Sequence, residues 1–213
     1  AGSAYEKGPS WGAMHLLEHM VHQGPKSFPD KKNIELFKEE TSVTSNAWTG
    51  GQELGFWFEF PDEGIDAGLK LFEEIVFNPT LPENELLRES NVIRQEYVDK
   101  WSNPYARYGR AVDKFLLGDE HVYVRDGLGQ PDFVSKVERS ELVALHKKFV
   151  RSENLVISVV GNVDPLKFTK QLSKTLNSYK GGKLEKLNVP KVVVPKSKYM
   201  NHNEDVDLVN INL

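Results

Sequence analysis

The stretch HLLEH, from His15 to His19, is the most informative part of this sequence. It lies inside a segment, Trp11 to His22, whose apolar residues recur at spacings of three and four, which predicts a helix. A spacing of four residues is slightly more than one helical turn, so the two imidazoles share one face about 6 Å apart. Glu18 lies one turn from His15 and brings a carboxylate to the same place. This pattern predicts a zinc site with a general base beside it.

The predicted site needs a third protein ligand, because catalytic zinc takes three and leaves one position for water. The chain has no cysteine, so the ligand must be His, Asp or Glu. His22 is rejected, because seven residues place it about 10 Å from His15 along the axis, too far to share a metal held at about 2 Å. Carboxylate candidates lie on a long helix predicted from Glu83 to Trp101. Glu89 and Glu96 are two turns apart on one of its faces, and spacing alone does not choose between them.

The segments around this motif predict an α+β fold, with helices packed on a mostly antiparallel sheet. Strands are predicted at Val43–Trp48, Leu54–Phe60, Leu155–Val160 and Val206–Leu213. An extended connector is expected at residues 183–200, and residues 1–213 are expected to form a single domain. Further helices are predicted at Lys31–Glu40, Asp62–Phe77, Tyr105–Leu117, Pro131–Val137, Glu138–Val150 and Pro165–Leu176.

Composition excludes several classes of partner. The net charge is −4 and charged residues make up 27% of the 213 residues, without a basic cluster, which argues against nucleic acid and anionic membranes. The longest apolar runs are far shorter than the roughly 20 residues that span a bilayer. We therefore expect a soluble protein, in the cytoplasm or an organelle matrix, although the sequence does not fix the compartment.

Three features together resemble the pitrilysin/insulinase family of zinc metallopeptidases, the inverzincins, which includes mitochondrial processing peptidase. They are the segment Gly12–His19, the run TSNAWT at Thr44–Thr49, and the pair Glu89 and Glu96. HLLEH is the familiar zinc-protease string HExxH with the chain direction reversed. In the family, the third ligand is a Glu 77 residues after the second histidine, and Glu96 follows His19 by 77 residues. The resemblance covers nearly the whole chain, and it is to the metal-bearing N-terminal half or a processing-peptidase-like subunit.

The resemblance implies one Zn²⁺ per chain, with His15, His19 and Glu96 as ligands and Glu18 as general base. It also implies that Glu89 supports the site by contacting a metal ligand and not the metal itself.

Substrate binding is expected at Asn46, Ala47 and Trp48. If their strand is an open edge, it can pair with an extended peptide through backbone hydrogen bonds.

The family pairs two homologous halves around a chamber, and this chain resembles one half without its first strands. We expect a zinc-dependent endopeptidase acting on peptides or unfolded polypeptides, with a homologous second domain or subunit in a homo- or heterodimer. The alternative is a non-catalytic or half-enzyme subunit that needs such a partner.

Overall fold

The computed structural model describes residues 1–8, 11–119, 121–182, 186–189, 191 and 199–205. Within these residues, helices pack against a two-stranded antiparallel sheet, which confirms the α+β class. The strands are β1 (Thr44–Thr49) and β2 (Leu54–Glu59). The helices are α1 (Ala13–Met20), α2 (Lys31–Thr41), α3 (Ile65–Phe77), α4 (Glu83–Ser102), α5 (Pro104–Leu117), α6 (Pro131–Val134), α7 (Arg139–Phe149) and α8 (Pro165–Leu176), and 3₁₀ turns lie at Ser3–Tyr5, Asp62–Gly64 and Ser152–Asn154.

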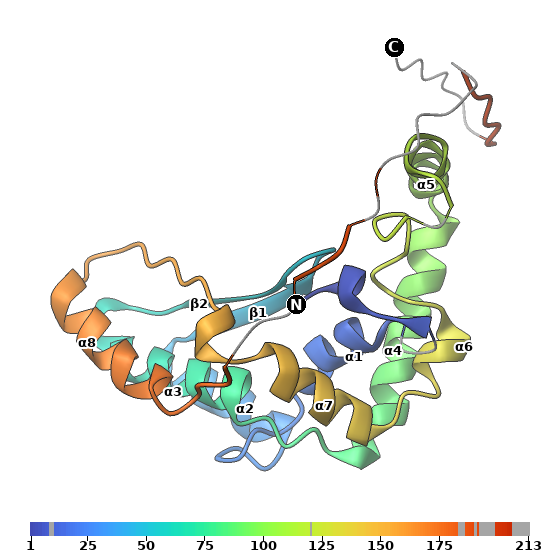
Figure 1. The fold of residues 1–213 in the computed structure, drawn as a ribbon. Helices are drawn as coiled ribbons and strands as arrows, with labels where there is room; N and C mark the ends of the chain where they lie inside the picture. The colour runs from blue at the N-terminus through green and yellow to red at the C-terminus, as the bar shows by residue number, and fades with distance from the viewer. Residues whose placement is uncertain (9–10, 120, 183–185, 190, 192–198, 206–213) are drawn as a thin grey trace.

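Helix α1 lies near the centre of the molecule, between the β1–β2 hairpin and the helices α4 and α7 (Figure 1). Helix α3 packs against β2, and α5 continues beyond the end of α4, away from the hairpin (Figure 1). The polar side chains of α1 therefore lie where a strand and a long helix meet.

The core fixes how α1 is rotated. All its apolar side chains are fully buried, namely Ala13, Met14, Leu16, Leu17 and Met20. They pack against buried residues of α3, α4 and α7. Burying each large side chain of this kind contributes on the order of 1.5–3 kcal/mol. The three remaining residues of the helix, His15, Glu18 and His19, are half-buried and lie on its open side.

The start of α1 is held by a buried carboxylate. Glu6 accepts hydrogen bonds from the backbone N–H groups of Gly12 (2.9 Å) and Met14 (2.6 Å), which have no partner within the helix. Gly12 has φ = 99°, and a Cβ there would lie 2.6 Å from Val134 Cγ2 and 2.8 Å from Gly129 Cα. Only glycine fits this conformation and this space.

Glu6 should make stability depend on pH. Burial raises the pKa of Glu6 from 4.5 to about 7, against the opposing effect of its two backbone donors. Because the folded-state pKa is the higher one, this group's stabilising contribution is present below about pH 4.5 and is lost as the pH rises through about 7. The loss should be on the order of 3 kcal/mol.

The variant Glu6→Gln has no proton to lose at this position. Relative to wild type, its free energy of unfolding should therefore rise by a few kcal/mol between about pH 5 and about pH 8. Urea unfolding of both proteins at the two pH values measures this difference. Parallel pH dependences would show that folding does not raise the pKa of Glu6.

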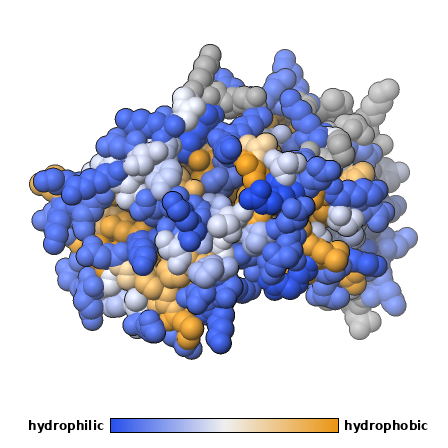
Figure 2. Space-filling model, turned by 90° about the horizontal axis from the view of Figure 1, so that it is seen from below, coloured by the Kyte–Doolittle hydropathy of each residue, from blue (hydrophilic) through white to orange (hydrophobic). Residues whose placement is uncertain are grey.

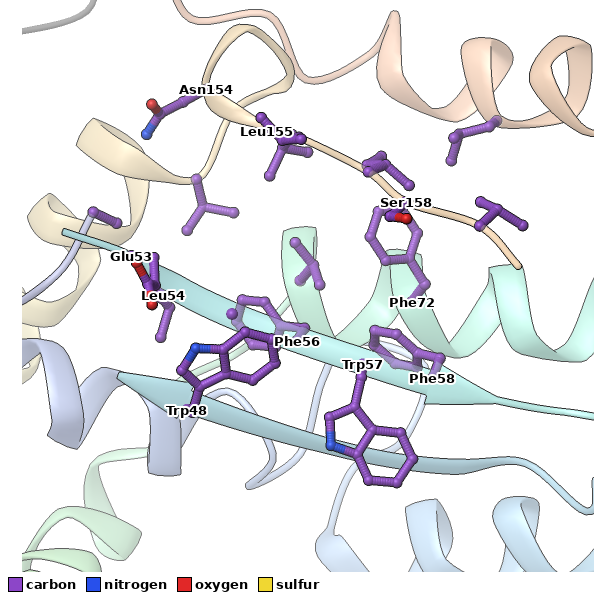
Figure 3. Close-up of a pocket in the computed structure, with 18 of the residues that line it drawn as sticks. Trp48, Glu53, Leu54, Phe56, Trp57, Phe58, Phe72, Asn154, Leu155 and Ser158 are labelled. Carbon is purple, nitrogen blue, oxygen red and sulfur yellow. The ribbon is translucent and has the colours of Figure 1, made fainter. Parts of the chain in front are cut away.

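The prediction of a buried strand at Leu155–Val160 is wrong. Among the described residues this segment pairs with no strand, and Val156 and Val160 are 100% and 96% exposed. It faces β2 across a cavity of about 670 Å³, which aromatic side chains such as Phe56 and Phe58 line (Figure 3). A run of β-branched residues forms a strand only where a neighbouring strand offers backbone hydrogen bonds, and the cavity separates this run from β2.

Two further predictions fall largely or wholly outside the described residues: the connector at residues 183–200 and the strand Val206–Leu213. The face seen in Figure 2 is mostly hydrophilic, with hydrophobic patches among the hydrophilic side chains. In the described part of the chain, no helix is both long enough and apolar enough to cross a lipid bilayer.

Candidate metal centre

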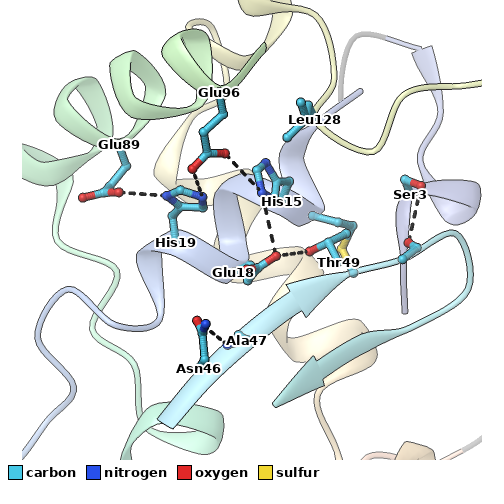
Figure 4. A network of polar contacts seen from close by, with 12 residues as sticks. Ser3, His15, Glu18, His19, Asn46, Ala47, Thr49, Glu89, Glu96 and Leu128 are labelled. Carbon is cyan, nitrogen blue, oxygen red and sulfur yellow. Dashed lines mark hydrogen bonds and ion pairs between the residues drawn. The ribbon is translucent and has the colours of Figure 1, made fainter. Parts of the chain in front are cut away.

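His15, His19 and Glu96 come together between α1 and α4 (Figure 4). One potential ligand atom from each lies within 4.8 Å of the other two, and this is the only such group among the described residues. The Nε2 atoms of His15 and His19 are 3.7 and 3.6 Å from the carboxylate oxygens of Glu96. His22 lies outside the group, as the helical spacing predicted.

Helix α4 supplies two carboxylates from one face. Glu96 faces both imidazoles, and Glu89, two turns earlier, reaches only His19, where its Oε2 lies 3.0 Å from Nδ1 (Figure 4). When the proton is on Nδ1, the ring donates a hydrogen bond to Glu89, and the lone pair of Nε2 points toward Glu96. The geometry thus assigns different places to the two carboxylates that the spacing left equivalent.

Glu18 lies on the β1 side of the histidines. Its Oε2 accepts a hydrogen bond from the Thr49 hydroxyl at 2.6 Å and lies 3.9 Å from His15 Nε2. Burial raises the pKa of Glu18, while the Thr49 hydrogen bond opposes the shift. A carboxylate with a raised pKa is a stronger base near neutral pH than one in water.

The two histidines differ electrostatically. Burial and the neighbouring His19 lower the pKa of His15 to about 4, so its imidazole is neutral at physiological pH. Burial also opposes protonation of His19, but the hydrogen bond to Glu89 and the negative charge of Glu96 raise its pKa.

The residues present fit a zinc ion. Two imidazole nitrogens and one carboxylate oxygen are a common ligand set of catalytic zinc, and tetrahedral ligands at about 2.0–2.1 Å lie about 3.3 Å from one another. The observed distances are 3.7 Å from His15 to Oε2 of Glu96 and 3.6 Å from His19 to Oε1, so the carboxylate need only turn to bring one oxygen toward both nitrogens. His15, His19 and Glu96 are the residues that would hold the ion.

The three residues expected to bind substrate lie on β1, but their side chains point to different sides. Asn46 and Trp48 are exposed, and Trp48 lies over Gly55 of β2. Ala47 is on the opposite face, which is the face of Thr49. In the described part of the chain β1 pairs only with β2, so its other edge has no strand partner.

Sequence reasoning missed Thr49 and Arg88. Strand alternation places Thr49 on the same face as Ala47, but nothing in the sequence shows that this face meets Glu18. Arg88 contacts Glu89, as described below, and an arginine next to a glutamate on a helix is too common to be a signal.

Comparisons with known proteins agree with the fold and identify a family. A model of the insulinase family (peptidase family M16) matches residues 1–120, and a model of the peptidase M16 inactive domain matches residues 136–213.

An uncharacterized zinc protease of Rickettsia felis is 28% identical over 185 residues, which are 85% of this chain and 43% of the relative. Two solved structures share the fold. The periplasmic protease PqqL of Escherichia coli has a TM-score of 0.80 at 23% identity, covering 91% of this chain and 22% of PqqL. A Helicobacter pylori protease has a TM-score of 0.78 at 22% identity, covering 92% and 47%.

The chain spans less than half the length of these relatives. A family model that covers residues 1–120 nonetheless includes more than half of the 213 residues, with the whole of the His15 to Glu96 cluster. The chain is a member of the insulinase family of peptidases, family M16.

Proposed function

We propose that this chain carries the metal site of a zinc-dependent endopeptidase, with His15, His19 and Glu96 as the ligands of one Zn²⁺. The observation that carries the proposal is the cluster itself: three donor atoms within 4.8 Å of one another, drawn from two helices, with a half-buried carboxylate next to them. The names of the relatives, which are zinc proteases, support the choice of metal.

When bound, zinc supplies a Lewis acid that polarises a carbonyl and makes water a better nucleophile near neutral pH. Glu18 then acts as the general base: it takes a proton from the attacking water and passes it to the leaving amine. The Thr49 hydroxyl orients the Glu18 carboxylate by its 2.6 Å hydrogen bond. Glu89 fixes the ring of His19 from the side away from the metal.

The substrate is proposed to be an extended peptide that lies along β1. The edge of β1 that is unpaired in the described part of the chain offers backbone donors and acceptors, which hold a peptide with little regard to sequence. Ala47 contributes backbone groups, and a bound peptide takes the place of Asn46 Oδ1, which now accepts from the Ala47 N–H at 2.9 Å. Asn46 and Trp48 flank the peptide on the exposed face.

A second candidate is a half-enzyme that needs a homologous domain or subunit. The chain spans 43% of its Rickettsia felis relative, and residues 136–213 match the family's inactive domain. In this proposal residues 1–213 form one metal-bearing domain, and the partner completes the substrate site.

The test is cleavage of an unstructured fluorogenic peptide by the purified chain, with bound zinc quantified, before and after a chelator and again after zinc is restored. Chelator-sensitive, zinc-restored cleavage supports a complete peptidase. Stoichiometric zinc without cleavage supports the half-enzyme. A chain that binds no zinc contradicts both.

A further inference from the structure

His19 is held at two points besides its metal-facing nitrogen. Its ring Nδ1 lies 3.0 Å from Glu89 Oε2, and its backbone carbonyl accepts a hydrogen bond of 3.2 Å from the side chain of Gln23, one turn later. The first contact fixes the rotation of the ring, and the second fixes the carbonyl where α1 ends. Together they fix both the imidazole and the backbone of the residue whose Nε2 must point at the metal.

Arg88 joins these two contacts into a closed ring. Its Nη2 donates to Gln23 Oε1 at 2.6 Å and lies 3.0 Å from Glu89 Oε1. The circuit therefore runs from Arg88 to Gln23, to the carbonyl and ring of His19, to Glu89 and back to Arg88. It uses the second oxygen of Glu89, so the two Glu89 contacts do not compete.

The contacts of this circuit matter because two of its members are buried. Gln23 and Glu89 are only 5% and 3% exposed, so water cannot readily replace a lost partner. Leaving a buried polar group unpaired costs about 1–3 kcal/mol, and more for a charged one. Arg88 is about half exposed, but Glu85, one turn earlier, anchors its Nε at 2.6 Å. Glu85 thus holds the guanidinium in place at the surface, while Nη2 contacts the buried side chains of Gln23 and Glu89.

We infer that Arg88 and Gln23 are positioning residues of the metal site, which act on zinc affinity through His19 without touching the ion. The inference rests on the proposed zinc site. Without Arg88, Gln23 loses its hydrogen-bond donor and Glu89 its ion-pair partner, and the imidazole of His19 is free to turn away from the direction that ligation requires. Ligating histidines generally depend on such supporting partners, whose loss weakens metal binding about 10–100-fold.

The experiment compares zinc dissociation constants of wild type, Arg88→Met, Gln23→Leu and the double variant, by competition with a chromophoric chelator. Each single variant should bind zinc about tenfold more weakly. Because both belong to one circuit, the double variant should be little weaker than either single variant. Arg88→Lys, which keeps a cationic donor, should recover part of the affinity.

The matched control is Arg94→Met. Arg94 lies on the same helix, is exposed, and makes no ion pair with any residue that the structure describes. Its removal should leave the dissociation constant unchanged. Imidazole ¹⁵N shifts of His19 in the zinc-free protein give a second measurement: the Nδ1 resonance should move in Arg88→Met, because the Nδ1–Glu89 hydrogen bond is no longer held in place, and should stay unchanged in the control.

The outcomes separate the two proposals. Wild type that binds no zinc would contradict the proposed function itself. Wild type that binds zinc, together with Arg88→Met and Gln23→Leu variants of equal affinity and unchanged ¹⁵N shifts, would leave the function standing and overturn the positioning role. Strictly additive losses in the double variant would show that the two residues do not act through one circuit.

Discussion

Glu18→Gln should lower the rate of peptide hydrolysis by about 10²–10⁴-fold while leaving bound zinc unchanged, the loss typical of removing a general base. Glutamine has nearly the shape of glutamate and can keep the hydrogen bond to Thr49, but it cannot take a proton from water. Glu18 is not one of the three clustered ligands, so the metal stays bound. Turnover and zinc content are measured together, in the assembly that cleaves the peptide.

Glu83→Gln is the control for this variant. Glu83 is an exposed carboxylate in the first turn of α4 and makes no contact with the cluster among the described residues, so its loss should leave turnover unchanged. Normal hydrolysis by Glu18→Gln would show that another group takes the proton.

His19→Ala should abolish both zinc binding and hydrolysis. It removes one of three ligands and also takes from the buried carboxylate of Glu89 its imidazole partner, leaving it only the ion pair with Arg88. Changing a residue that only supports a ligand raises the zinc dissociation constant by up to roughly 100-fold. Removing the ligand itself should raise it further. Metal analysis after dialysis and chelator competition measure the loss.

His22→Leu provides the comparison from the same helical region. His22 lies three residues after His19, its Nε2 is buried without a partner in the described part of the chain, and burial lowers its pKa to about 4. An apolar side chain of similar size should be tolerated there, and zinc should stay bound. Loss of zinc in His22→Leu but not in His19→Ala would reverse the ligand assignment.

The helices could be predicted because their signals are local. The apolar spacing in α1, the Asp30 and Asp164 caps of α2 and α8, and Pro104 at the start of α5 each act within a few residues. The prediction of a strand at Leu155–Val160 failed because its signal is not local. Whether an apolar run becomes a strand depends on a partner far away in the sequence, and periodicity contains no information about that partner.

The site, too, contains one part that local spacing predicts and another part that only the folded structure brings together. The pairing of His15 and His19 follows from one helix and could be read from spacing alone. Choosing Glu96 over Glu89 needs the packing of α4 on α1, so before the structure it rested only on resemblance to a family. The hydrogen bonds of Thr49 and Arg88 join residues 31 and 65 positions apart in the chain, and only the folded structure brings them together.

The most direct test of the central claim is zinc K-edge absorption spectroscopy on the metal-loaded chain, combined with metal analysis. The account predicts one zinc per chain, bound by two imidazoles and a carboxylate at about 2.0–2.2 Å, and loss of the carboxylate signal in Glu96→Ala. Zinc bound by three imidazoles, or the same spectrum without Glu96, would contradict the assignment of His15, His19 and Glu96.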